Sequence, residues 1–150
     1  MDSGGKKNAT FNSYLQLSGV KLCGTVFFSV DDNDDTCVML SILLGLANYQ
    51  VATAGTLVQG LKLAKSRQFD LYLLDFKLPD GTGLQLCQQI RCFDSLTPII
   101  LCSGKSGLDS RQEALTAGAQ AYLTKPVEPD VLKETMHWLL NKARHTGQRL

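Results

Sequence analysis

Several polar residues stand directly after apolar, strand-like runs, and they carry the groups that phosphoryl transfer to a carboxylate needs. They are Asp31 and Asp32 after residues 25–30, Asp75 after residues 71–74, Ser103 after residues 99–102, and Lys125 after residues 122–124. A further apolar run around Val51 ends on no such residue. Because parallel strands bring their carboxyl ends to one edge of a sheet, we expect these side chains to share a pocket.

Charge balance sets the next expectation for this pocket. Asp31, Asp32 and Asp75 would repel one another by roughly 1–4 kcal/mol per close pair at effective dielectrics between water and a protein surface. Lys125 supplies one positive charge, and a magnesium ion with oxygen ligands would supply two more. The pattern therefore predicts a Mg²⁺ site that includes these carboxylates.

β-rich runs alternate with helical patterns along the chain, which predicts an α/β fold with a parallel sheet. We expect a flavodoxin-like, doubly wound sheet of five strands in the order 2-1-3-4-5, with helices on both faces. The predicted strands span residues 25–30, 49–54, 70–74, 98–102 and 119–123. The predicted helices span residues 36–47, 56–67, 84–90, 109–117 and 129–143. Proline and glycines predict an irregular loop over residues 75–83.

Size and composition limit the classes of protein. The 150 residues suffice for one domain, predicted over residues 25–144, with an N-terminal extension over 1–24 and a tail over 145–150. The net charge of +1 disfavours direct binding of nucleic acid. Five cysteines without a C-x-x-C motif indicate reduced thiols and a cytoplasmic protein. The longest uncharged apolar stretch, residues 37–47, is too short to cross a membrane.

Four motifs, in order and spacing, resemble those of response-regulator receiver domains. They are Val30-Asp31-Asp32, Leu74-Asp75 with Leu78-Pro79-Asp80-Gly81, Ile99-Ile100-Leu101-Cys102-Ser103-Gly104, and Ala121-Tyr122-Leu123-Thr124-Lys125-Pro126. The resemblance covers residues 26–143. It implies that Asp75 accepts a phosphoryl group from a histidine kinase, a histidine phosphotransfer protein or a small acyl phosphate.

The resemblance also implies roles for the other site residues. Mg²⁺ would be held by Asp31, Asp32, Asp75 and the backbone carbonyl of Lys77. Lys125 would pair with the phosphoryl oxygens, Ser103 would hydrogen-bond the phosphorylated aspartate, and Tyr122 would be the aromatic switch residue. The bond before Pro126 is commonly cis in this family.

Three interpretations follow from these motifs. The first is a stand-alone phosphoacceptor that signals through contacts with an unknown downstream protein and has no separate substrate turnover. The second is an interaction module of receiver fold that works without phosphorylation. The third is the receiver portion of a hybrid histidine kinase.

The helix predicted over residues 36–47 departs from the usual pattern of a surface helix. Its core side is expected to consist of Thr36, Met39, Leu40, Leu43 and Ala47. The opposite side carries Val38, Ile42 and Leu46 where charges are normal. Either the extension covers this strip through Phe11, Tyr14 or Leu15, or the strip contacts a partner or a second copy in a homodimer.

The presence of Lys77 and Lys105 is a second departure. These lysines lie two positions after Asp75 and Ser103. Such sites tune the access of hydrolytic water in the family that the chain resembles. If both amines contact the phosphate, we expect a slowly decaying phosphoaspartate; the alternative is that both point into solvent.

Overall fold

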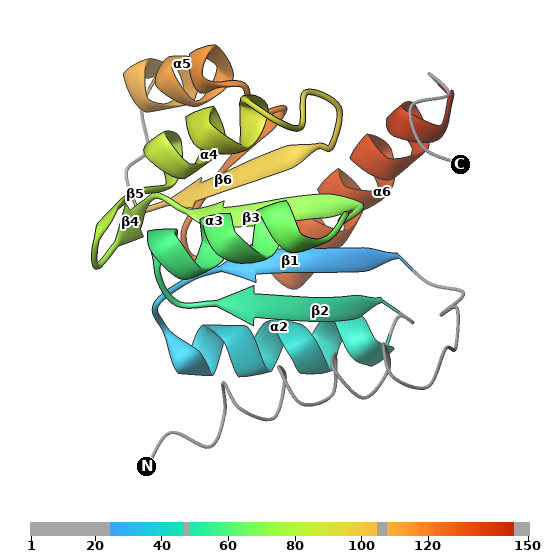
Figure 1. The fold of residues 1–150 in the computed structure, drawn as a ribbon. Coiled ribbons are helices and arrows are strands. Elements are labelled where there is room, and N and C mark those ends of the chain that lie inside the picture. Colours follow the sequence, from blue (N-terminus) through green and yellow to red (C-terminus); the bar gives the residue numbers. More distant parts are fainter. Residues whose placement is uncertain (1–24, 47–48, 105–107, 146–150) are drawn as a thin grey trace.

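The computed structural model describes residues 25–46, 49–104 and 108–145. Its main sheet is parallel, with five strands in the order β2-β1-β3-β6-β7 (Figure 1). In that order the strands are β2 Gln50–Ala54, β1 Val26–Val30, β3 Leu71–Asp75, β6 Ile99–Ser103 and β7 Ala121–Thr124. Counting only these strands, the order is 2-1-3-4-5. The predicted fold class is confirmed.

Helices cover both faces of the sheet (Figure 1). They are α2 Asp34–Leu46, α3 Leu57–Ser66, α4 Gly83–Arg91, α5 Leu108–Ala117 and α6 Pro129–His145. Alternate strand residues point to opposite faces, so neighbouring Phe27 and Phe28 belong to different core clusters. The Phe27 cluster includes Leu44 of α2 and Met136 of α6, whereas α3, α4 and α5 pack on the Phe28 cluster. No described helix is long and apolar enough to cross a membrane.

Short polar residues and glycine fix several helix ends. The Asn33 side chain accepts a hydrogen bond from the Thr36 backbone nitrogen at 3.2 Å, and Thr56 caps α3. Thr82 and Gln85 form a reciprocal capping box at the start of α4. After α5, Gly118 adopts a φ of 108°, which a residue without Cβ adopts readily. The predicted end of that helix at Gly118 is confirmed.

The prediction of an irregular loop over residues 75–83 was wrong in part. β4 (Lys77–Leu78) and β5 (Gly81–Thr82) form a small antiparallel pair. Pro79 and Asp80 lie in the turn between the two strands. Because the proline nitrogen is not needed for the ladder at that position, the flanking residues are free to pair.

The predicted core side of α2 was also wrong in part. Met39 is 49% exposed, and the buried residues of the helix are Cys37, Leu40 and Leu44. Ala47 lies outside the described residues. Thr36 and Leu43 are half-buried at the edge of a cavity. The helix is therefore rotated by about one position from the predicted orientation, and the expected exposure of Val38, Ile42 and Leu46 is confirmed.

Gly83, the first residue of α4, packs directly against the backbone of Asp75. A Cβ there would overlap the backbone oxygen of Asp75 and lie 2.8 Å from Leu101 Cδ2. We expect Gly83→Ala to lower the free energy of unfolding by about 1–3 kcal/mol in urea titrations, because backbone must move. The control is Gly45→Ala, where nothing lies within 4 Å and helix propensity predicts a gain of about 0.5–1 kcal/mol. Equal stability of Gly83→Ala and wild type would contradict this packing.

Candidate functional site

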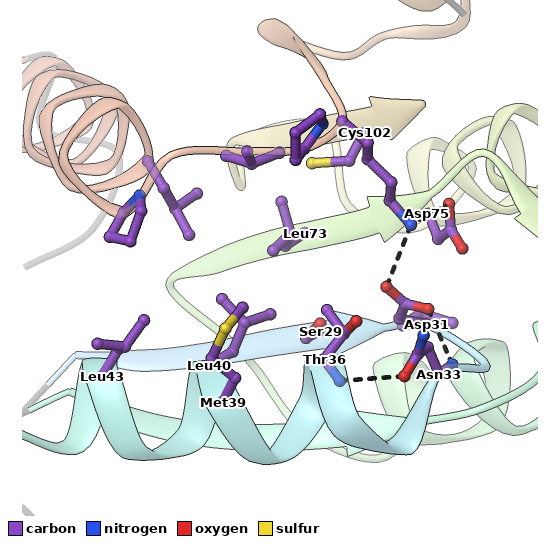
Figure 2. Close-up of a pocket in the computed structure, with 16 residues that line it drawn as sticks. Ser29, Asp31, Asn33, Thr36, Met39, Leu40, Leu43, Leu73, Asp75 and Cys102 are labelled. Carbon is purple, nitrogen blue, oxygen red and sulfur yellow. Dashed lines mark hydrogen bonds and ion pairs between the residues drawn. The ribbon is translucent and has the colours of Figure 1, made fainter. Parts of the chain in front are cut away.

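Asp31, Asp75 and Lys125 meet at the carboxyl edge of the sheet, as the sequence predicts. Asp75 is the last residue of β3, whereas Asp31 and Lys125 directly follow β1 and β7. Lys125 Nζ lies 3.0 Å from Asp75 Oδ1 and 3.4 Å from Asp31 Oδ2. Figure 2 shows Asp31 and Asp75 at the same end of a cavity. Both carboxylates are buried, and the lysine side chain is partly exposed.

Asp32 is exposed and lies beside the buried carboxylates of Asp31 and Asp75. One carboxylate oxygen from each of Asp31, Asp32 and Asp75 lies within 4.8 Å of the other two. A cluster of hard oxygen donors with net negative charge suits Mg²⁺, which is commonly held by one or two carboxylates and several waters. The residues present therefore fit the predicted ion.

Burial and the neighbouring lysine have opposite effects on Asp75. Desolvation raises the pKa of the Asp75 carboxyl group above its ordinary value, although hydrogen bonds from Lys125 and from the Lys77 backbone N–H oppose the rise. Burial alone would lower the pKa of Lys125, but the hydrogen bond and charge of Asp75, together with Asp31, outweigh burial and raise it. Lys125 therefore stays cationic at neutral pH.

Backbone contacts hold the site side chains in place. Asp31 Oδ1 accepts a hydrogen bond from the Asn33 nitrogen at 2.9 Å, so its other oxygen faces Lys125. The Lys125 nitrogen donates to the Ser103 carbonyl at 2.7 Å, which ties β7 to the end of β6. The Lys125–Pro126 peptide bond is cis, as the resemblance implied.

Ser103 and Tyr122 are both buried at the predicted positions. Leu101 pairs with Tyr122 and Ser103 pairs with Thr124, so alternation along these strands places Ser103 and Tyr122 on the same face of the sheet. Tyr122 belongs to the core cluster under α3, α4 and α5. Lys77 is exposed on β4. Lys105 lies outside the described residues, so the prediction about it stays untested.

Asp31 and Asp75 of the acidic cluster line one end of a cavity of about 470 Å³ (Figure 2). Its walls come from α2, from β1, β3 and β6, and from the segment leading into α6 (Figure 2). Met39, Leu43, Leu73 and Leu132 make much of this lining apolar. The buried Ser29 hydroxyl lines the same space and has no hydrogen-bond partner among the described residues.

The four described cysteines are free thiols. Burial raises the pKa of Cys37 and of Cys87 to about 11, and that of Cys102 to about 12. Only Cys92 is exposed among these four. The buried thiols therefore act as small apolar core residues and not as nucleophiles.

Asp80 has a role that sequence reasoning missed. Its carboxylate accepts hydrogen bonds from the backbone nitrogens of Leu57 at 2.7 Å and Val58 at 3.0 Å, at the start of α3. These bonds lower the pKa of Asp80. The only signal in the sequence was the Pro-Asp-Gly turn. That turn does not reveal that Asp80 contacts the start of α3.

We expect Asp80→Asn to be less stable than wild type at neutral pH. A lowered pKa in the folded state means that the carboxylate stabilises the fold above its unfolded pKa, and that this contribution is lost as pH falls through the lowered value. Urea midpoints of both proteins, measured from pH 7 down to pH 3, should therefore converge on acidification. A difference that persists unchanged in acid would contradict an ionic cap.

Comparison with known proteins agrees with this fold and site. The family model described as the response regulator receiver domain matches residues 27–137. The chain therefore belongs to the response-regulator receiver family.

Individual relatives are similar over most of this chain. The transcriptional regulatory protein ZraR of Salmonella typhimurium is 34% identical over 121 residues, covering 81% of this chain and 27% of that protein. The response regulator protein PilR of Pseudomonas aeruginosa is 38% identical over 105 residues, covering 70% and 24%. The chain thus spans about a quarter of these relatives. A CheY-like receiver domain protein from Methanospirillum hungatei has a TM-score of 0.79 and 29% identity, covering 82% of this chain and 98% of that one.

Proposed function

We propose that this receiver domain, residues 25–144, accepts a phosphoryl group on Asp75 from the phosphohistidine of a histidine kinase or histidine phosphotransfer protein. The observation that carries the proposal is the ion-paired Asp75, 3.0 Å from Lys125 Nζ and within a cluster of three carboxylates. Membership of a signalling family agrees with it. Transfer would take place in the cytoplasm.

The chemistry requires an ionised carboxylate and a stabilised phosphoryl group. An Asp75 oxygen attacks phosphorus while the bond from phosphorus to the histidine nitrogen breaks, and the electron pair leaves with the imidazole. Mg²⁺ held by Asp31, Asp32, Asp75 and the Lys77 carbonyl would offset charge on the phosphoryl oxygens. Lys125, whose Nζ lies 3.0 Å from Asp75 Oδ1, would pair with the phosphoryl oxygens. Water later cleaves the acyl phosphate. We expect no substrate turnover by the receiver domain beyond this modification and its reversal.

Output would pass through Ser103 and Tyr122 to a downstream protein. Their shared face and burial support a coupled movement, in which Ser103 turns toward the phosphoryl group and the Tyr122 ring takes the space released. ZraR is named a transcriptional regulator, but the present chain matches only about a quarter of it. We propose that the receiver itself acts by protein contacts and not by binding nucleic acid.

The proposal is tested with acetyl phosphate as the phosphoryl donor. When Asp75 attacks its phosphorus, the bond from phosphorus to the acetyl oxygen breaks and acetate is the leaving group. Intact mass should show a gain of one phosphoryl group that requires Mg²⁺ and is reversed by neutral hydroxylamine, which cleaves acyl phosphates. Peptide mapping should place the group on Asp75. No uptake under any of these conditions would instead favour an interaction module that works without phosphorylation.

A further inference from the structure

One face of α2 is apolar and exposed. Four residues form it, here called the α2 stripe: Val38, Met39, Ile42 and Leu46. Their exposed fractions run from 44% at Val38 to 80% at Leu46. No charged residue follows Asp35 in this helix. A surface helix normally carries charges on its outer face, so a contiguous apolar strip of this kind indicates a binding surface.

The α2 stripe is continuous with the cavity beside the acidic cluster. Met39 belongs to both, and the neighbouring Leu43 lines the cavity from the same helix (Figure 2). Pro129 and Leu132 of α6 line the same cavity. The α2 stripe and the adjoining cavity mouth, together called the groove, form a continuous apolar surface on which an apolar chain segment can pack.

We propose that this groove binds residues 6–17 of the same chain, through Phe11, Tyr14 and Leu15. The position at which the chain enters the domain supports this occupant. Gln50 N donates to the Thr25 carbonyl at 3.0 Å, and Tyr49 N donates to the Leu44 carbonyl at 2.9 Å. Residue 25 therefore lies close to the last turn of α2, at one end of the groove.

Length and charge agree with this occupant. Nine residues separate Leu15 from Thr25 and can span about 30 Å when extended, whereas the 13 residues of α2 extend about 20 Å. Leu15 can thus reach any part of the stripe. Lys6 and Lys7 lie farther toward the amino terminus, and a segment running from the last turn of α2 to its first would bring them to the exposed acidic residues Asp34 and Asp35. Charge complementarity therefore sets the direction of the segment.

The covalent connection favours this segment over a second copy of the chain. A short linker gives its own segment an effective concentration on the order of millimolar, which a second copy reaches only at high protein concentration. The apolar residues at positions 11, 14 and 15 have the three- and four-residue spacing that places side chains on one face of a helical turn. The segment therefore combines a high effective concentration with apolar residues at a spacing that suits the groove.

The methionines of the full chain provide the test. There are three: Met1, Met39 on the stripe, and the fully buried Met136. Under dilute hydrogen peroxide, followed by peptide mass spectrometry, Met39 should oxidise several-fold more slowly in wild type than in the double variant Phe11→Asp/Leu15→Asp. Met136 should stay slow in both and so report that the domain is folded. The control Asn12→Asp/Ser13→Asp adds the same charge at other positions and should behave like wild type.

Two results would overturn the proposal. One is Met39 oxidation at the same rate in wild type and in Phe11→Asp/Leu15→Asp. The other is protection that disappears on dilution together with a halving of the mass in light scattering, which would show that a second copy covers the stripe. Neither readout depends on Asp75, so a failure here leaves the proposed phosphoryl transfer untouched.

Discussion

Asp75→Asn is expected to take up no detectable phosphoryl group from acetyl phosphate under conditions in which wild type gains one. The amide keeps the shape of the side chain and a hydrogen-bond acceptor for the Lys77 N–H. It lacks the anionic oxygen that attacks phosphorus, so no acyl phosphate forms. Intact mass after incubation with acetyl phosphate and Mg²⁺ measures the outcome. Asp35→Asn, which changes an exposed aspartate in the first turn of α2, should retain full uptake.

Stability measurements separate loss of chemistry from loss of fold. Because burial raises the pKa of Asp75, its ionised form is disfavoured in the folded protein, and a neutral amide removes that penalty. Asp75→Asn should therefore unfold at a urea concentration no lower than wild type at pH 7. Uptake by Asp75→Asn at the wild-type rate would show that another residue is the acceptor.

The convergence of Asp31, Asp75 and Lys125 could be predicted from the sequence because a local pattern determines it. Each residue ends or directly follows a buried apolar run, and in a parallel sheet the carboxyl ends of the strands lie at one edge. The strand order 2-1-3-4-5 was predicted as that of a flavodoxin-like sheet, and right-handed connections put helices on both faces. The Mg²⁺ site was predicted from the charge balance of these site residues, whereas the roles of Ser103 and Tyr122 came from the family resemblance; all three stay predictions.

The rotation of α2 could not be predicted in the same way. From Thr36 to Leu46 the helix has no charged residue, so apolar side chains occur on every side and no polar face marks the solvent side. Packing selected Cys37, Leu40 and Leu44 for burial. The sequence pattern had favoured Met39, which is also apolar and lies one position from Leu40.

The capping role of Asp80 depends on tertiary structure and not on spacing. Its partner nitrogens, in Leu57 and Val58, lie more than 20 residues earlier in the chain. The contact exists because β4 and β5 pair and bring the turn between them to the start of α3. Two-residue strands are too short to show an alternating pattern, so neither the hairpin nor its contact could be inferred beforehand.

Asp31→Asn is expected to weaken Mg²⁺ binding by more than about tenfold. Even changes in residues that support ligands typically cost 10–100-fold in metal affinity, and Asp31 contributes a charged oxygen to the cluster itself. The amide oxygen still accepts the hydrogen bond from the Asn33 nitrogen, so the local backbone should be preserved. Calorimetric titration of each protein with MgCl₂ gives the affinity directly.

Thermal unfolding gives an independent measurement of the same loss. At a Mg²⁺ concentration tenfold above its dissociation constant, wild type should gain about 1.4 kcal/mol, because the ion binds the folded state and not the unfolded one. Asp31→Asn should gain less than half of this at the same concentration, since its site is then at most about half occupied. Asp35→Asn is again the matched control, with one negative charge removed from the same end of α2. If Asp31→Asn and wild type were stabilised equally by Mg²⁺, the ion would bind away from the Asp31, Asp32 and Asp75 cluster.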